Sequence, residues 1–179
     1  MSTLVLPDPT LVVLLGAAGS GKSTLAARLF APDEVVSSDA LRAAISGNEA
    51  DQRATAPAFR ALHRTIDRRL AAGALTVVDA TNAKRDARRP LIQRARATGT
   101  PVVAIVLDLP PSTIHAQNAA RPTRVVEPTV VDRHLEAIRN DLDHDRLTTE
   151  GFDHIVMLRS STEVDDLRID RRTPVNPPT

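Results

Sequence analysis

A glycine-rich loop constrains the fold of this chain more than any other feature. Residues 16–24 read Gly-Ala-Ala-Gly-Ser-Gly-Lys-Ser-Thr and match the pattern G-x-x-x-x-G-K-S. The five apolar residues before the loop predict a buried strand, and the helix formers after it carry apolar residues one turn apart. A strand, such a loop and a helix, in this order, are typical of a phosphate-binding loop, or P-loop.

The P-loop predicts a nucleoside triphosphate as ligand. Its glycines let backbone N–H groups turn inward, and the N-terminus of the next helix adds its positive end. We expect Lys22 to reach the β- and γ-phosphates and the Ser23 hydroxyl to ligate Mg²⁺. The predicted ligands are therefore ATP or another nucleoside triphosphate, together with Mg²⁺. The residues expected to bind them are Gly16, Ala17, Ala18, Gly19, Ser20, Gly21, Lys22, Ser23 and Thr24.

Predicted strands and helices alternate along the rest of the chain. Strands are expected at about 34–37, 75–78, 101–107 and 154–158, and helices at about 38–45, 57–72, 84–98, 110–119, 128–142 and 163–167. This alternation predicts an α/β fold whose central parallel sheet has helices on both faces. The most hydrophobic strand, 101–107, is expected at its centre. We expect one domain over residues 1–170, with an irregular lead-in at 1–9 and a disordered tail at 171–179.

The carboxyl ends of the parallel strands are expected to form the ligand site. Four segments would meet there: the P-loop and residues 37–42, 79–82 and 121–124. Asp79 ends a strand of uncharged residues, which favours a carboxylate that holds Mg²⁺ over a plain strand-ending acid. Thr81 and Asn82 are candidates for contacts with phosphate or acceptor, although Asn82 also suits a turn.

Asp39 follows the second predicted strand, and two roles are open to it. Its carboxylate could accept a proton from a hydroxyl that attacks the γ-phosphate. It could instead cap the following helix, a role that Ser38 could also take. Arg42 lies one helical turn on and would share the same face. It would hold a phosphate or orient the acceptor, or it would simply be solvated.

Two groups of arginines could meet phosphates. Arg121 and Arg124 lie between two predicted helices, within a helical lid expected at about 120–145. Lid arginines neutralise charge that develops during phosphoryl transfer, whereas an arbitrary pair of this spacing is more often solvated. The cluster of Arg85, Arg88 and Arg89 is either a solvated helix face or a surface for an anionic acceptor.

Composition excludes several classes of protein. The formal net charge is +1, so a protein that coats nucleic acid is not expected. Three phenylalanines without tyrosine or tryptophan argue against an extended stacking platform for single strands. No apolar run is long enough to cross a membrane, and the absence of cysteine fits the reducing cytoplasm. The five histidines show no metal-ligand spacing and are interpreted as structural or surface residues. Only Lys22 and Lys84 are lysines; the other basic residues are arginines.

Taken together, these segments resemble the 5′-hydroxyl polynucleotide kinase domain of bacterial polynucleotide kinase-phosphatases, and more distantly the bacteriophage polynucleotide kinase. The resemblance rests on residues 16–24, 35–42 and 75–82 and on the pair Arg121 and Arg124. It implies that Asp39 is the general base, that Arg42 contacts acceptor or transferred phosphate, and that the arginine pair belongs to a lid. One departure is Gln117, which stands where the family tends to have a basic residue. The phosphatase and ligase modules that often accompany this kinase are not found in the 179 residues.

The sequence therefore predicts a P-loop kinase fold and a phosphotransferase that acts on a hydroxyl group. The favoured acceptor is the single-stranded 5′-hydroxyl end of RNA or DNA, bound by Arg42, Thr81, Asn82 and Arg85. The catalytic residues would be Lys22, Asp39, Arg121 and Arg124, with Ser23 and Asp79 at the metal. A kinase for a small molecule, such as an antibiotic or metabolite, is the alternative. A nucleotide-binding switch without catalysis is a third hypothesis.

Overall fold

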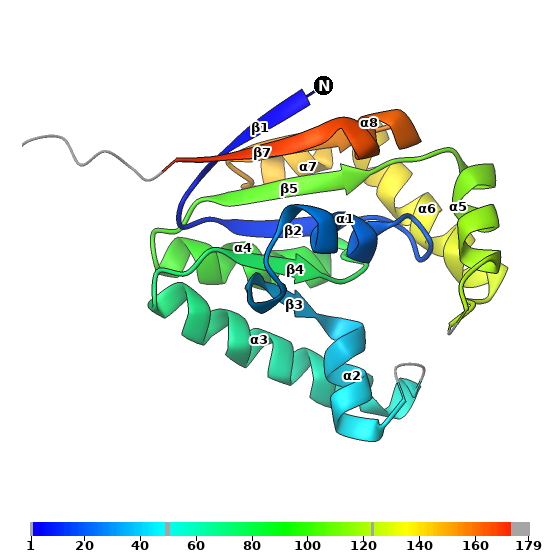
Figure 1. Cartoon of the computed structure of the whole chain (residues 1–179), viewed down its shortest axis with the longest axis horizontal. Helices are drawn as coiled ribbons and strands as arrows, with labels where there is room; N and C mark the ends of the chain where they lie inside the picture. Colours follow the sequence, from blue (N-terminus) through cyan, green and yellow to red (C-terminus); the bar gives the residue numbers. More distant parts are fainter. Residues whose placement is uncertain (1, 49–50, 123, 173–179) are drawn as a thin grey trace, which may run out of the picture.

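A five-stranded parallel sheet forms the centre of the protein, in the strand order β3-β4-β2-β5-β6 (Figure 1). The computed structural model describes residues 2–48, 51–122 and 124–172 of the 179-residue chain. The strands of the sheet are β2 (Leu11–Leu15), β3 (Val35–Ser37), β4 (Thr76–Asp79), β5 (Val102–Leu107) and β6 (His154–Leu158). The most hydrophobic strand, β5, lies inside the sheet, as expected, with β2 and β6 parallel on its two sides, and β2 is the middle strand. Both strands are buried along their whole length, so hydrophobicity alone could not rank them.

The helices connect these strands in the predicted order. They are α1 (Lys22–Leu29), α2 (Ser38–Ser46), α3 (Thr55–Ala71), α4 (Arg85–Ala97), α5 (Pro111–Ala119), α6 (Pro128–Asp143), α7 (Arg146–Glu150) and α8 (Ser161–Asp166), with 3₁₀ turns at Pro32–Glu34 and Gln52–Ala54. None of the helices in residues 2–48, 51–122 and 124–172 is long and apolar enough to span a membrane.

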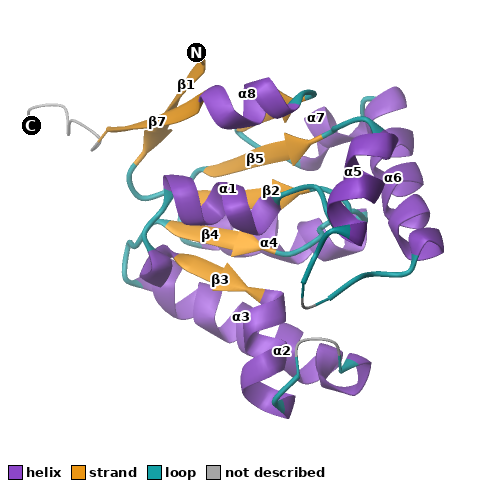
Figure 2. Cartoon of the chain, turned by 45° about the vertical axis from the view of Figure 1, so that its right-hand side comes forward, coloured by secondary structure: helices purple, strands orange, loops and turns teal. Residues whose placement is uncertain are grey.

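The two faces of the sheet pack against different elements. Successive side chains of a strand point to opposite faces, so Leu11, Val13 and Leu15 share a core with α3, α4, α6 and α7. Val12 and Leu14 point the other way and pack with α1. Helices thus cover both faces of the parallel sheet, and the predicted α/β fold is confirmed. Beyond the carboxyl ends of the strands lie α5 and the first half of α6 (Figure 2).

A second, two-stranded sheet was missed from the sequence. Strand β1 (Ser2–Pro7) pairs in parallel with β7 (Leu167–Arg172), so residues 1–9 are not simply irregular. Leu4 and Leu6 of β1 are buried in the same core as α1. The sequence did not reveal this strand, because its partner lies at the other end of the chain and because Pro7 ends the strand and Pro9 follows it. The ordered chain also extends past residue 170, since Arg171 donates to Glu34 at 2.6 and 2.7 Å. Residues 173–179 of the expected tail lie outside the described residues.

Candidate active site

One cavity at the carboxyl ends of the strands brings the four predicted segments together. Its volume is about 940 Å³. The P-loop contributes residues 18–24, the start of α2 contributes Asp39 and Arg42, the end of β4 contributes residues 79–84, and the segment after α5 contributes Arg121 and Arg124. The register of the sheet explains part of this meeting, because Ser37 of β3 pairs with Asp79 of β4. Gly16 and Ala17, the first two residues of the loop, are buried and do not line the cavity.

The P-loop packs tightly against α5. Gly19 has a φ of +87°, and a Cβ at this position would lie 2.7 Å from the Cβ of Asn118 and 2.8 Å from the Ile114 carbonyl oxygen. Only glycine fits here, because both the positive φ and the close approach exclude a side chain. Asn118 in turn holds the segment before α6, donating to the Val126 carbonyl at 2.7 Å and accepting from the Val126 N–H at 3.1 Å.

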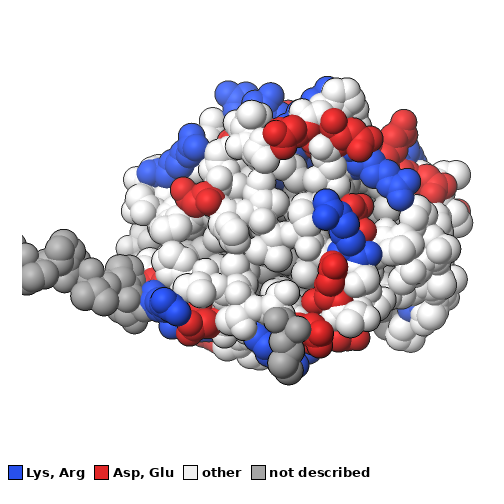
Figure 3. Space-filling model, turned by 90° about the horizontal axis from the view of Figure 1, so that it is seen from above, with Lys and Arg blue, Asp and Glu red and all other residues white. Residues whose placement is uncertain are grey.

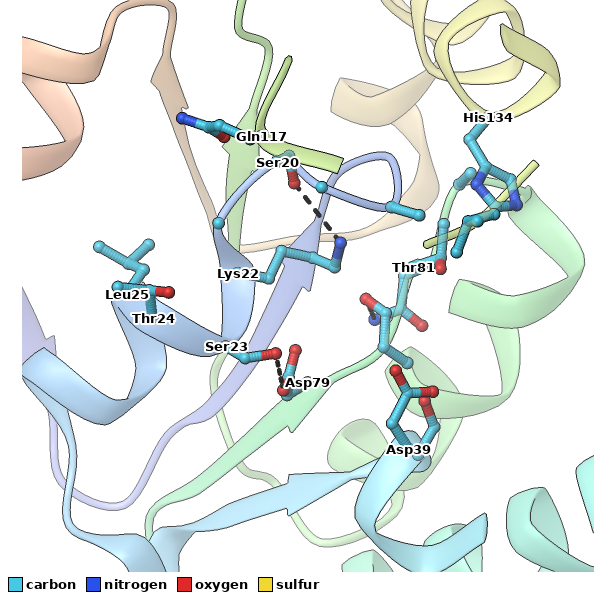
Figure 4. Close-up of a pocket in the computed structure, with 18 of the residues that line it drawn as sticks. Ser20, Lys22, Ser23, Thr24, Leu25, Asp39, Asp79, Thr81, Gln117 and His134 are labelled. Atoms are coloured by element: carbon cyan, nitrogen blue, oxygen red, sulfur yellow. Dashed lines mark hydrogen bonds between the residues drawn. The ribbon is translucent and has the colours of Figure 1, made fainter. Parts of the chain in front are cut away.

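Lys22 is buried among the backbone carbonyls of its own loop. Its Nζ donates to Gly16 O at 2.9 Å and to Ala17 O at 2.8 Å, and lies 3.4 Å from Ser20 Oγ (Figure 4). Burial lowers the pKa of Lys22 to about 8, against the opposing effect of the Asp79 and Asp39 carboxylates. The lysine therefore keeps its charge at neutral pH, at the position where the loop is expected to receive phosphate.

Ser23 and Asp79 form a pair of oxygen ligands next to Lys22. The Ser23 hydroxyl donates to Asp79 Oδ2 at 2.7 Å. Mg²⁺ prefers oxygen ligands and is usually bound by one or two protein groups together with phosphate oxygens and water. Within the described part of the chain, no group of three His, Cys, Asp or Glu residues could hold a metal ion by itself. The pair thus fits Mg²⁺ bound jointly with a nucleotide.

Asp39 is held by two arginines. Its Oδ1 lies 2.6 Å from Arg42 NH1, within the same helix, and 2.7 Å from Arg124 NH1. Burial alone would raise the pKa of Asp39, but Arg124 and Arg42 outweigh burial and lower it. The N-cap of α2 is Ser37, whose hydroxyl accepts from Ala40 N at 3.4 Å. The side chain of Asp39 is thus not needed as the helix cap and faces the cavity instead.

The other predicted acceptor residues are only partly in the cavity. Thr81 lines it, and Thr81 O accepts from Gly16 N at 3.2 Å. Asn82 has a φ of 48°, and its amide donates to Leu14 O at 2.8 Å and Ala80 O at 3.3 Å. This supports the turn role for Asn82, because these bonds tie β4 to β2. Arg85 is exposed and does not line the cavity, so its contact with an acceptor stays a prediction.

Several cavity residues were not predicted from the sequence, among them Lys84, Phe59 and His134. Composition could have indicated Lys84, because the chain has only two lysines and Lys22, the other one, was already placed at the P-loop. Both lysines line this cavity. The sequence predicts that His134 is a structural or surface residue, but its ring points into the cavity from α6 (Figure 4). Burial and then the charge of Lys22 lower the pKa of His134 to about 4, so it is neutral at pH 7. Its position beside the apolar stripe of α6 could have suggested an inward ring.

Several solved structures have the same fold. A chain in the structure of the Pnkp1/Rnl/Hen1 RNA repair complex superposes with a TM-score of 0.66 at 18% identity, over 78% of this chain and 47% of that chain. This chain therefore spans about half the length of that protein. A sugar kinase from Janibacter sp. HTCC2649 gives a TM-score of 0.55 at 22% identity, over 84% and 85% of the two chains. The AvrRxo1-ORF1:-ORF2 structure with ATP gives 0.61 at 18% identity, over 80% and 52%.

These likenesses show the P-loop kinase fold, and sequence comparison shows the family. No curated protein sequence matches the chain. The sequence model of a family described as "AAA domain" matches residues 11–144, from β2 through α6. Because the match covers most of the chain, including the P-loop, Asp39, Asp79, Arg121 and Arg124, the protein belongs to this AAA domain family of P-loop proteins.

Proposed function

We propose that this protein is a kinase that transfers the γ-phosphate of ATP to the 5′-hydroxyl end of RNA or DNA. The proposal rests on one observation: the P-loop and the ionised carboxylate of Asp39 line the same cavity. The kinase-like fold and the family support phosphoryl transfer. The choice of a polynucleotide acceptor rests on the sequence resemblance and is supported by the RNA repair complex among the structures of the same fold.

The donor would bind at the P-loop. Backbone N–H groups of the loop and the N-terminus of α1 would hold the β- and γ-phosphates. Lys22 would exchange its bonds to Gly16 O and Ala17 O for bonds to phosphate oxygens. Ser23 and Asp79 would hold Mg²⁺, which, when bound, offsets the negative charge of the phosphates.

The acceptor would bind on the Asp39 side. As the hydroxyl oxygen forms its bond to the γ-phosphorus, the bond from that phosphorus to the bridging oxygen breaks and ADP leaves. The hydroxyl proton passes to the Asp39 carboxylate, which stays ionised at neutral pH because Arg124 and Arg42 outweigh the effect of burial on its pKa. Arg121 and Arg124 would neutralise charge on the transferred group. Gln117 lines the cavity without adding charge, so these two arginines supply the positive charge of the segment after α5.

Contact with the rest of the strand is expected to be limited. On the face that Figure 3 shows, the side of β1 and α8, acidic and basic side chains are interspersed. The net charge of +1 agrees with a surface that attracts polyanions weakly. We therefore propose that the enzyme recognises the end of the strand and little beyond it.

The proposal predicts label transfer to 5′-hydroxyl strands only. The test is incubation with γ-labelled ATP, Mg²⁺ and matched RNA and DNA oligonucleotides that carry either a 5′-hydroxyl or a 5′-phosphate. Because the reaction needs a free hydroxyl next to Asp39, 5′-phosphate strands should stay unlabelled. Label on a small hydroxylated compound, with none on any strand, would instead favour the small-molecule kinase. Tight ATP binding with no transfer to any acceptor would favour the nucleotide-binding switch.

The pKa of Lys22 predicts a basic limit to activity. Since burial lowers this pKa to about 8, the ammonium loses its proton as pH rises through that value, and with it its charge for phosphate. We expect kcat/KM for ATP, which reports the free enzyme, to fall above a pH of about 8. On the acid side, the lowered pKa of Asp39 should keep the carboxylate active well below neutral pH. A profile of kcat/KM that stays flat up to the ordinary pKa of lysine would contradict this assignment.

A further inference from the structure

The largest fully buried side chain of the described residues is an arginine, Arg88 of α4. The sequence grouped it with Arg85 and Arg89 as a solvated face or a surface for the acceptor. The structure contradicts this grouping: Arg85 and Arg89 are exposed, whereas the side chain of Arg88 is 0% exposed. Periodicity could not reveal the difference, because arginine on a polar helix gives no apolar signal for the buried face.

All five N–H donors of the Arg88 guanidinium have acceptors. Two acceptors are backbone carbonyls that follow β4, Asn82 O at 3.0 Å and Ala83 O at 2.8 Å. The other three are carboxylate oxygens: Asp141 Oδ2 of α6 at 2.6 Å, Glu150 Oε2 of α7 at 2.7 Å, and Glu150 Oε1 in a further short contact. One side chain thus joins the β4–α4 loop, residues 80–84, to α6 and α7.

Both sides of this junction contribute to the cavity. The β4–α4 loop continues from Asp79 and places Thr81 and Lys84 on the cavity wall. Helix α6 places Val130 and His134 on another part of the wall. Arg88 itself does not line the cavity and is therefore not a catalytic residue.

We propose that Arg88 is a positioning residue that fixes the β4–α4 loop against α6 and so sets the shape of the cavity between Asp79 and the α6 wall. Stability alone is a weak reason for such a cluster, because buried ion pairs can often be replaced by apolar side chains without loss. Arg146 also lies 3.5 Å from Asp141, so Arg88 belongs to a network of two arginines and two carboxylates. The cluster instead fixes orientation, because the planar guanidinium of Arg88 holds its four acceptor groups at defined angles. The kinetic part of this proposal rests on the proposed function.

The chain contains a matched control at the opposite end of β4. Arg69 of α3 bonds Leu75 O at 2.7 Å and Thr76 Oγ1 at 3.2 Å, and is partly buried. Like Arg88, it ties a helix to the backbone beside β4. Unlike Arg88, it lies at the amino end of the strand, away from the cavity. If the role of Arg88 were purely structural, substitution of either arginine would affect kcat only through stability. The two variants would then have similar kcat values under conditions where both are folded.

The test compares Arg88→Lys with Arg69→Lys at temperatures where both are folded. Lysine keeps the charge but cannot hold four groups in one plane. We expect Arg88→Lys to lower kcat by up to about a hundredfold, the cost of misplacing reacting groups by about 1 Å, with KM for ATP little changed. Arg69→Lys should leave kcat near wild type. In hydrogen exchange, amides of the β4–α4 loop and of α6 should exchange faster together in Arg88→Lys only.

Equal kcat values for the two variants, with unchanged exchange in the β4–α4 loop and α6, would overturn the proposal. If Arg88→Lys does not fold, Glu150→Gln removes one charged acceptor group at nearly constant size, and the same two measurements apply to it. If the wild-type protein transfers phosphate to no acceptor, the proposed function fails while the exchange experiment still decides whether Arg88 couples the loop to α6.

Discussion

Replacement of Lys22 by Ala should lower kcat by about two to three orders of magnitude, the cost of losing one preorganised donor at a developing charge. Lys22 is the cation closest to the P-loop carbonyls and should follow the γ-phosphate as its bond breaks. The measurement is the single-turnover rate of transfer from γ-labelled ATP to the best acceptor. Because this buried ammonium is costly in the free protein, the variant should remain folded, with no loss of melting temperature.

Arg89→Ala is a suitable control for Lys22→Ala, because Arg89 is also a cation but is exposed on α4 and does not line the cavity. Its kinetics should equal those of the wild type. A folded Lys22→Ala protein that transfers phosphate at the wild-type rate would refute the assignment of the P-loop as the donor site.

Asp39→Asn should reduce transfer by about a hundredfold or more, the range for loss of a general base. Asn nearly matches the shape of Asp but cannot take the hydroxyl proton. The affinity for ATP should change little, because the loop and Lys22 do not bond Asp39. Single-turnover rates and equilibrium binding of ATP, measured on the same preparation, separate the two effects.

The matched control for Asp39→Asn is Asp86→Asn. Both aspartates are second residues of their helices, so both substitutions remove a carboxylate from a helix N-terminus. Asp86 is exposed and outside the cavity, so its variant should lose at most a little stability and no activity. Equal activity of the two variants would show that Asp39 is not the general base and that its carboxylate only stabilises the start of α2 electrostatically.

The sequence by itself determined the features that depend on neighbouring residues. Strand β2, the glycine loop and the first turn of α1 are contiguous, so one short stretch of sequence is enough to predict the phosphate-binding site. The alternation of strands and helices likewise predicted a parallel sheet and the edge at which ligands bind, and the structure confirms the fold. The structure also places Asp39, Asp79, Arg121 and Arg124 at that edge of the sheet, while their roles at the site stay predictions.

Only the tertiary structure decided the features that depend on contacts between distant segments. Strand β1 exists because β7, more than 150 residues away, provides its hydrogen bonds. Arg88 is buried, and Arg85 is not, because the carboxylates of Asp141 and Glu150 come from helices much later in the chain. Asp39 faces the cavity rather than capping α2 because Ser37 takes the cap and Arg124 crosses from another segment to meet the carboxylate. A local pattern gives a polar side chain its possible partners, but only packing selects the partner that it meets.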